Sequence, residues 1–186
     1  NVSAADMDND GDMDILTVSA NDDQVRWYEN DGAVNPSWTA ITISSAADYV
    51  EGLYQADLDN DGDIDVISAS YSDDKLAWYE NDGAADPSFT ANTVTSSAAD
   101  SPNQVYAEDL DNDGDIDIIS SSSNDDKIIW FESDGAADPS FTANTITSSA
   151  DGAATVYAID VDSDGDIDVI SGSETDDKVA WYENDG

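Results

Sequence analysis

A nine-residue acidic loop recurs four times along the 186-residue chain, and this repetition constrains the fold more than any other feature. Each copy has the pattern Asp-x-Asp-x-Asp-Gly-Asp-x-Asp, and successive copies start 51, 52 and 51 residues apart. The copies occupy residues 6–14, 57–65, 109–117 and 160–168. A tryptophan recurs with the same spacing, at Trp27, Trp78, Trp130 and Trp181. A fixed period of this length predicts an array of equivalent supersecondary units.

Each copy has the residue pattern of β-strands. Apolar residues alternate with polar ones or form short β-branched runs between clusters of Gly, Asn, Asp and Ser, and no segment has a helical apolar stripe. We expect a first strand before the acidic loop, a second after it, a third that contains the tryptophan, and a more polar fourth. The expected first strands are 2–5, 53–56, 105–108 and 156–159, and the second strands are 15–19, 66–70, 118–122 and 169–173.

Four strands in each repeat predict an all-β fold, a β-propeller of four-stranded antiparallel blades. The repeats are 1–51, 52–103, 104–154 and 155–186, in a single β-propeller domain 1–186. Small residues on the first strands fit the crowded axis of a small ring. These residues are Ala4, Ala107 and Ala158, with Gln55 as the exception. We therefore predict a four-bladed ring; the alternative is that the chain forms part of a larger propeller.

The last repeat lacks the residues for a fourth strand, so we expect an unpaired strand edge along residues 178–184. An open edge is a template for pairing with another chain. Self-association, or contact with neighbouring domains of a longer chain, is therefore expected. The start at Asn1 directly before a strand favours a processed product or a segment of a longer protein.

The charge balance predicts bound cations. The chain has 44 Asp and Glu against 4 Lys and Arg, with no His, for a formal net charge of −40. Such a charge in a compact domain repels itself unless cations neutralise part of it. Nucleic acid is excluded as a partner because there is no basic patch, and membrane insertion because no run of about 18 apolar residues exists. Cysteine is absent, so only oxygen ligands remain for a metal.

The acidic loops have the composition of a calcium site. Carboxylates at alternate positions converge when the backbone curls, and the glycine at position six permits the sharp turn. Ca²⁺ takes six to eight oxygens in flexible geometry, whereas Mg²⁺ demands a stricter octahedron. We expect four ions, with side-chain oxygens from positions one, three, five and nine and a backbone carbonyl from position seven. The candidate metal residues are Asp6, Asp8, Asp10, Asp12, Asp14, Asp57, Asp59, Asp61, Asp63, Asp65, Asp109, Asp111, Asp113, Asp115, Asp117, Asp160, Asp162, Asp164, Asp166 and Asp168.

Two other interpretations of the loops are weaker. An EF-hand requires Glu at position twelve and flanking helices, and neither is present. Charge runs are commonly only solvated surface. Four recurrences that retain the glycine and all five aspartates argue against a merely solvated surface.

The segments DLDNDGDIDVISAS and DDKLAWYENDG resemble the FG-GAP/VCBS repeat family, whose members form β-propellers with a calcium loop between the first two strands of a blade, as in the integrin α-subunit head. The resemblance covers essentially the whole chain. It implies that Asp6, Asp8, Asp10 and Asp14 and their counterparts coordinate Ca²⁺. Family propellers commonly have seven blades, whereas this chain has four copies.

Three classes of function remain. An enzyme is not expected, because no His or Cys offers a base or nucleophile and the clustered aspartates belong to the repeat. A calcium-dependent lectin-like module is an alternative, since Tyr28, Tyr79, Phe131 and Tyr182 could stack on sugar rings. We favour a structural or adhesive calcium-binding unit of an extracellular surface protein, matrix or fibre, because the copies are nearly identical. Its partners would be further copies or domains, or a glycan or protein ligand.

Removal of calcium should lower the melting temperature strongly, because an ion that binds only the folded chain stabilises it by mass action. Thermal unfolding with excess chelator and with millimolar calcium measures the effect. An unchanged melting temperature in chelator would contradict a structural role for calcium.

Overall fold

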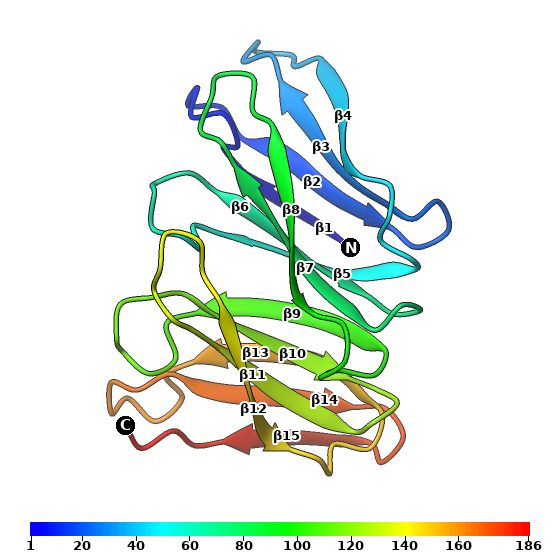
Figure 1. The fold of residues 1–186 in the computed structure, drawn as a ribbon, viewed down its shortest axis with the longest axis vertical. Helices are drawn as coiled ribbons and strands as arrows, with labels where there is room; N and C mark the ends of the chain where they lie inside the picture. Colours follow the sequence, from blue (N-terminus) through cyan, green and yellow to red (C-terminus); the bar gives the residue numbers. More distant parts are fainter.

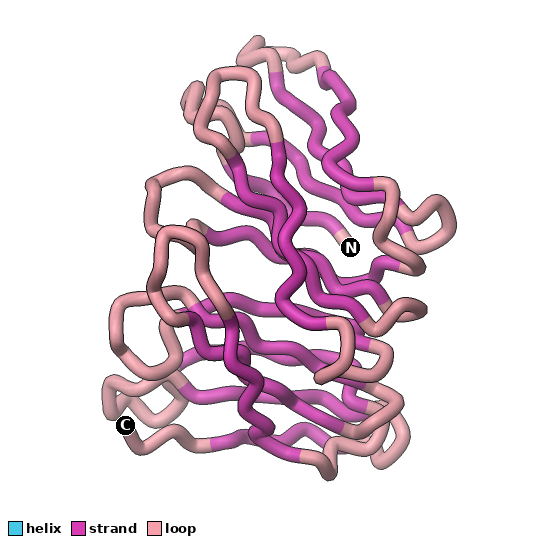
Figure 2. The backbone as a smooth tube through the Cα atoms, viewed as in Figure 1, coloured by secondary structure: helices cyan, strands magenta, loops and turns pink.

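The chain folds entirely into β-strands and connecting loops. The computed structural model describes all residues 1–186 and contains no helix. Fifteen strands form four antiparallel sheets, and each sheet uses consecutive strands in chain order. Figure 2 shows the loops gathered where the strands end, on two sides of the molecule. No helix long and apolar enough to cross a bilayer occurs.

Each sheet corresponds to one repeat, but the second, third and fourth sheets begin at Val50, Pro102 and Ala153, before the predicted starts of their repeats. The first sheet contains β1 (Val2–Ala5), β2 (Asp14–Ser19), β3 (Gln24–Asn30) and β4 (Trp38–Ser44). The second contains β5 (Val50–Ala56), β6 (Asp65–Ser70), β7 (Lys75–Asn81) and β8 (Phe89–Thr95). The third contains β9 (Pro102–Glu108), β10 (Asp117–Ser122), β11 (Lys127–Ser133) and β12 (Phe141–Thr147). The fourth contains only β13 (Ala153–Ile159), β14 (Asp168–Ser173) and β15 (Lys178–Tyr182), as the sequence predicts.

The sheets stack face to face along the long axis of the molecule, with the first at one end and the fourth at the other (Figure 1). Three separate apolar cores lie between successive sheets. Trp27 of the first sheet, for example, packs edge-to-face against Phe89 of the second, with ring centroids 6.3 Å apart. The burial pattern follows from the stack: β6 and β10 are buried at every residue, whereas β2 alternates. A sheet in the middle of the stack is covered on both faces by its neighbours, whereas the first sheet is covered on only one face.

The predicted four-bladed ring is not confirmed, because the sheets do not close on one another. The alanines expected at a crowded axis lie elsewhere: Ala107 and Ala158 are buried in the cores between sheets. The first strands instead carry a column of tyrosines. Tyr106 lies between Tyr54 and Tyr157, with ring centroids 4.5 and 4.8 Å apart. These bulky rings do not suit the narrow axis of a small ring.

The two faces of a sheet pack against different neighbours in the stack. We call the face that packs on the following sheet the C-face, and the face that packs on the preceding sheet the N-face. The C-face of the fourth sheet is uncovered: Val179 is 81% exposed and Trp181 47% exposed, whereas the equivalent Leu76 and Trp78 are 0% and 1% exposed. The N-face of the first sheet is uncovered as well, with Val2 and Trp38 exposed.

This contrast predicts unequal effects from the same substitution in two repeats. Trp78→Ala should cost about 3–5 kcal/mol of unfolding free energy, because it empties a filled core. Trp181→Ala should cost less, about 1–2 kcal/mol in a dilute monomer, because about half of the Trp181 surface is already exposed. Denaturant unfolding of both variants in calcium measures the difference. Equal losses would contradict the open stack.

Candidate metal centre

The acidic loops join the first two strands of every sheet, and their backbone takes a conformation that few residues adopt. Position four has positive φ, 58° at Asn9, and position six has φ of 94° at Gly11. The other three loops repeat both values closely. No heavy atom lies within 4 Å of a Cβ added at Gly11, so the glycine is required by its φ and not by space. The loop thus curls around a centre.

Carboxylates converge at that centre in all four loops. In each loop three aspartates place one oxygen apiece within 4.8 Å of one another. The clusters are Asp6, Asp8 and Asp10; Asp57, Asp59 and Asp61; Asp109, Asp111 and Asp113; and Asp160, Asp162 and Asp168. Hard oxygen donors at this separation suit Ca²⁺. The four clusters could therefore hold one metal ion per repeat.

Backbone N–H groups hold the first aspartate in place. Asp6 accepts from Asp10 N–H at 3.1 Å through one oxygen and from Gly11 N–H at 3.0 Å through the other. The second and third repeats contain the same pair of bonds. Because each carboxylate oxygen has two acceptor sites, these bonds leave lone pairs that can face a cation.

The aspartate at position nine is buried and joins two segments of its repeat through hydrogen bonds. Asp65 is 1% exposed, and its two oxygens accept from Leu58 N–H at 3.0 Å and Asn81 N–H at 2.8 Å. The bonds tie the acidic loop to the end of the third strand. The equivalent Asp14, Asp117 and Asp168 make the same two bonds in their own repeats. Only in the fourth loop does this residue also belong to the carboxylate cluster.

The aspartate at position seven points away from the cluster and links neighbouring repeats. Asn9 donates from Nδ2 to Asp63 Oδ1 of the second repeat at 2.7 Å. The pairs Asn60 with Asp115 and Asn112 with Asp166 repeat this bond at 3.0 Å. Sequence reasoning missed these asparagines. The available signal was that position four is Asn in three repeats and Ser163 only in the last, which has no following sheet.

Of the twenty predicted residues, the structure therefore brings together the aspartates of positions one, three and five in three loops, and of positions one, three and nine in the fourth. The remaining residues lie outside the carboxylate clusters. They are Asp12, Asp14, Asp63, Asp65, Asp115, Asp117, Asp164 and Asp166. A backbone carbonyl ligand at position seven stays a prediction.

The aspartate at position three of each acidic loop is harder to ionise than a free aspartate, whereas the Asn184 N–H lowers the pKa of Asp168 in the fourth cluster. Burial, with repulsion from neighbouring carboxylates adding to it, raises the pKa of Asp8, Asp59 and Asp111. Burial also raises the pKa of Asp65 to about 7 and that of Asp117 to about 6. A divalent ion favours the ionised form of such groups and offsets the repulsion.

These pKa shifts predict an unusual pH dependence for the calcium-free protein. Between about pH 4 and 7 the folded chain holds more protons on Asp65 and Asp117 than the unfolded chain, so its stability should fall as pH rises through this window. With saturating calcium the trend should reverse, because the ion binds the deprotonated carboxylates. Calorimetric melting at pH 4, 5, 6 and 7 tests both arms. A calcium-free melting temperature that rises with pH would contradict the shifts.

Comparison with known proteins agrees with the repeat structure. A model of the FG-GAP-like repeat matches residues 6–68, 57–120 and 109–171. No curated protein matches the sequence. The chain also resembles the solved structure of an Agrocybe aegerita lectin, whose title describes specific recognition of non-reducing terminal N-acetylglucosamine. The two structures superpose with a TM-score of 0.63 at 18% sequence identity. The match covers 92% of this chain, and the chain spans about half (46%) of the lectin structure's length. Three matched repeats across most of the sequence show that the chain belongs to the FG-GAP-like repeat family.

Proposed function

We propose that the chain is a calcium-binding structural or adhesive repeat unit of an extracellular surface protein, matrix or fibre. The observation that supports it is the set of four carboxylate clusters, one per repeat, in loops of the same conformation. The side chains of positions one, three and five would hold the ion in the first three loops, and Asp160, Asp162 and Asp168 in the fourth. Bound calcium supplies positive charge at the point where each loop repels itself.

Calcium in this role acts on the fold. Each ion would join the two ends of a β1–β2-type hairpin, and the position-nine aspartate already connects that loop to the third strand. Four Ca²⁺ bring eight positive charges and reduce the formal charge from −40 to −32. Extracellular calcium near a millimolar fills about half to nine tenths of the sites of the weaker extracellular class, whose Kd is about 10⁻⁴–10⁻³ M. An extracellular setting therefore suits such sites.

The uncovered faces at the two ends of the stack support the structural part of the proposal. Val179 and Trp181 on the C-face of the fourth sheet correspond to residues that the next sheet buries in the first two repeats. In the third repeat the next sheet buries Ile128 and partly buries Trp130. An N-face like that of the second or third sheet would cover them. Such a face could belong to a second copy of this chain or to further repeats of the same protein, and the chain would then form part of a larger propeller or a longer assembly.

A carbohydrate-binding module is the second candidate. It is favoured by the structural similarity to a lectin, which is a similarity of fold alone at 18% identity. Both candidates are binding functions, and the absence of His and Cys favours them over catalysis.

Calcium stoichiometry tests the proposal directly. Titration calorimetry of the metal-free chain should give four Ca²⁺ per chain, and Asp59→Asn should reduce the number to three and lower the melting temperature. A site held at about 100 times its Kd contributes about 2.7 kcal/mol, so the loss should be of that order.

Asp86→Asn is the matched control, because it removes one charge from an exposed loop outside the clusters. It should leave the stoichiometry at four. Equal effects of the two substitutions would show that general charge, and not a defined site, accounts for calcium binding.

A further inference from the structure

A polar pocket of about 780 Å³ lies at the opposite end of the strands from the acidic loops. There the turns between second and third strands meet the linkers between sheets. The turns supply six lining residues, two from each of three repeats: Tyr71, Ser72, Ser123, Asn124, Glu174 and Thr175. The volume falls within the range of about 300–1,000 Å³ that is typical of ligand pockets.

The backbone frame of the pocket is the same in all three repeats. A turn N–H donates to a linker carbonyl at 3.0–3.2 Å in each, from Tyr71 to Tyr49, from Ser123 to Ser101 and from Glu174 to Gly152. In each repeat a second bond runs from the N–H of the next turn residue to the carbonyl of the aspartate that comes directly before this linker residue. The repeat therefore fixes the positions of the lining residues.

The side chains on this frame differ at every lining position. One turn position is Tyr71, Ser123 and Glu174 in the three repeats, and the next is Ser72, Asn124 and Thr175. The acidic loops at the other end keep all five aspartates and the glycine in every copy. A frame that is constant for folding but varied in its exposed side chains resembles the way binding loops are presented on a rigid scaffold.

Tyr49, a linker residue that lines the pocket, has a strained backbone conformation. Its φ is +54°, and the equivalent positions carry the smaller Ser101 and Gly152 at similar φ. A bulky residue rarely adopts this region, and such outliers cluster at functional sites. The Tyr49 ring packs edge-to-face on Tyr71, with centroids 5.9 Å apart, yet stays 42% exposed. The pair therefore offers an aromatic surface to the pocket.

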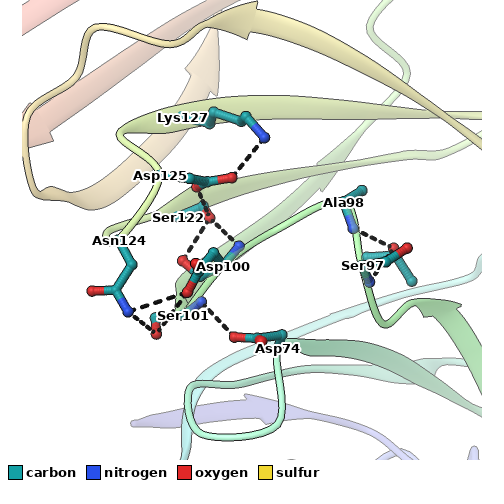
Figure 3. A network of polar contacts seen from close by, with 10 residues as sticks. Asp74, Ser97, Ala98, Asp100, Ser101, Ser122, Asn124, Asp125 and Lys127 are labelled. Carbon is teal, nitrogen blue, oxygen red and sulfur yellow. Dashed lines mark hydrogen bonds and ion pairs between the residues drawn. The ribbon is translucent and has the colours of Figure 1, made fainter.

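Asn124 provides a fixed polar group beside this surface. Its Nδ2 donates to Asp100 Oδ1 at 3.1 Å and to Ser101 Oγ at 2.8 Å, as Figure 3 shows. Ser101 is held in turn by its N–H bond to Asp74. The Asn124 Oδ1 has no partner in the chain and is available to accept a hydrogen bond from a ligand.

The charge of the pocket selects the ligand class. Glu51 and Glu174 line it, and none of the four basic residues does. Arg26, Lys127 and Lys178 are paired with aspartates. An anionic ligand would be repelled. An aromatic surface surrounded by carboxylate, amide and hydroxyl groups suits a neutral ring with an apolar face and many hydroxyl groups.

We propose that this pocket binds a neutral saccharide. The sugar ring stacks on Tyr49 and Tyr71, and its hydroxyl groups bond to Glu51, Asn124 and Glu174. The inference rests on the carbohydrate-binding candidate and gives it a site. Because the acidic loops lie at the other end of the strands, calcium supports sugar binding only through the stability of the fold.

The test is an array of neutral pyranose oligosaccharides probed with the calcium-loaded chain, with sialylated and sulfated glycans and polylysine as charged comparisons. A neutral glycan that binds is then titrated by calorimetry. Tyr49→Gly and Asn124→Ser should each weaken binding at least tenfold, and Tyr49→Gly should not lower the melting temperature because glycine relieves the positive φ. Asn21→Ser is the matched control, since Asn21 occupies the same turn position in the first repeat, outside the pocket.

The inference is overturned if the folded chain binds no neutral glycan, if only polylysine binds, or if Tyr49→Gly and Asn124→Ser bind as tightly as the unchanged chain. The melting temperature of the same samples with and without calcium separates this failure from failure of the calcium proposal. A calcium-dependent melt without glycan binding refutes the saccharide site alone. Glycan binding with a calcium-independent melt refutes the structural calcium alone.

Discussion

Repulsion among the carboxylates of each acidic loop opposes the curled conformation of that loop, to which the first three strands of its sheet are attached. Three carboxylate oxygens lie within 4.8 Å of one another in a loop curled by a glycine at φ near 100°, so the ionised groups repel one another unless a cation lies between them. The same loop fixes the first two strands of its sheet, and its position-nine aspartate fixes the third. A cation in each of the four acidic loops would therefore stabilise the hairpin, the sheet and the stack together.

Cooperation between repeats follows from bonds that cross from one sheet to the next. The Asn9–Asp63 type of bond joins adjacent acidic loops, and Asn81 Nδ2 donates to Met7 O across the first core at 2.9 Å. At the other end, Asp23, Asp74 and Asp126 accept from the backbone of the following linker. Each sheet is therefore held at both ends as well as by its apolar faces. The bonds to the linkers involve the linker backbone and not the side chains of the turn residues that line the pocket, and those side chains differ between repeats.

Much of the fold could be predicted from the sequence because the relevant signals are local and repeated. Alternating apolar residues and turn glycines locate the strands, and the short last repeat predicts the three-stranded sheet. The closed ring was not confirmed, because the angle between sheets depends on how side chains such as Tyr54 and Tyr106 pack between strands from different repeats. The loops were found from their composition, but the separate role of the position-nine aspartate was not. The pocket was missed because its residues share no motif: they meet only when turns from three repeats are placed side by side.

Diffraction from crystals grown with calcium, recorded at a wavelength where calcium scatters anomalously, would show directly whether the acidic loops hold calcium. We expect four anomalous peaks per chain, each surrounded by the carboxylates of one acidic loop. Loops that keep this conformation at millimolar calcium with only water at their centres would contradict this expectation.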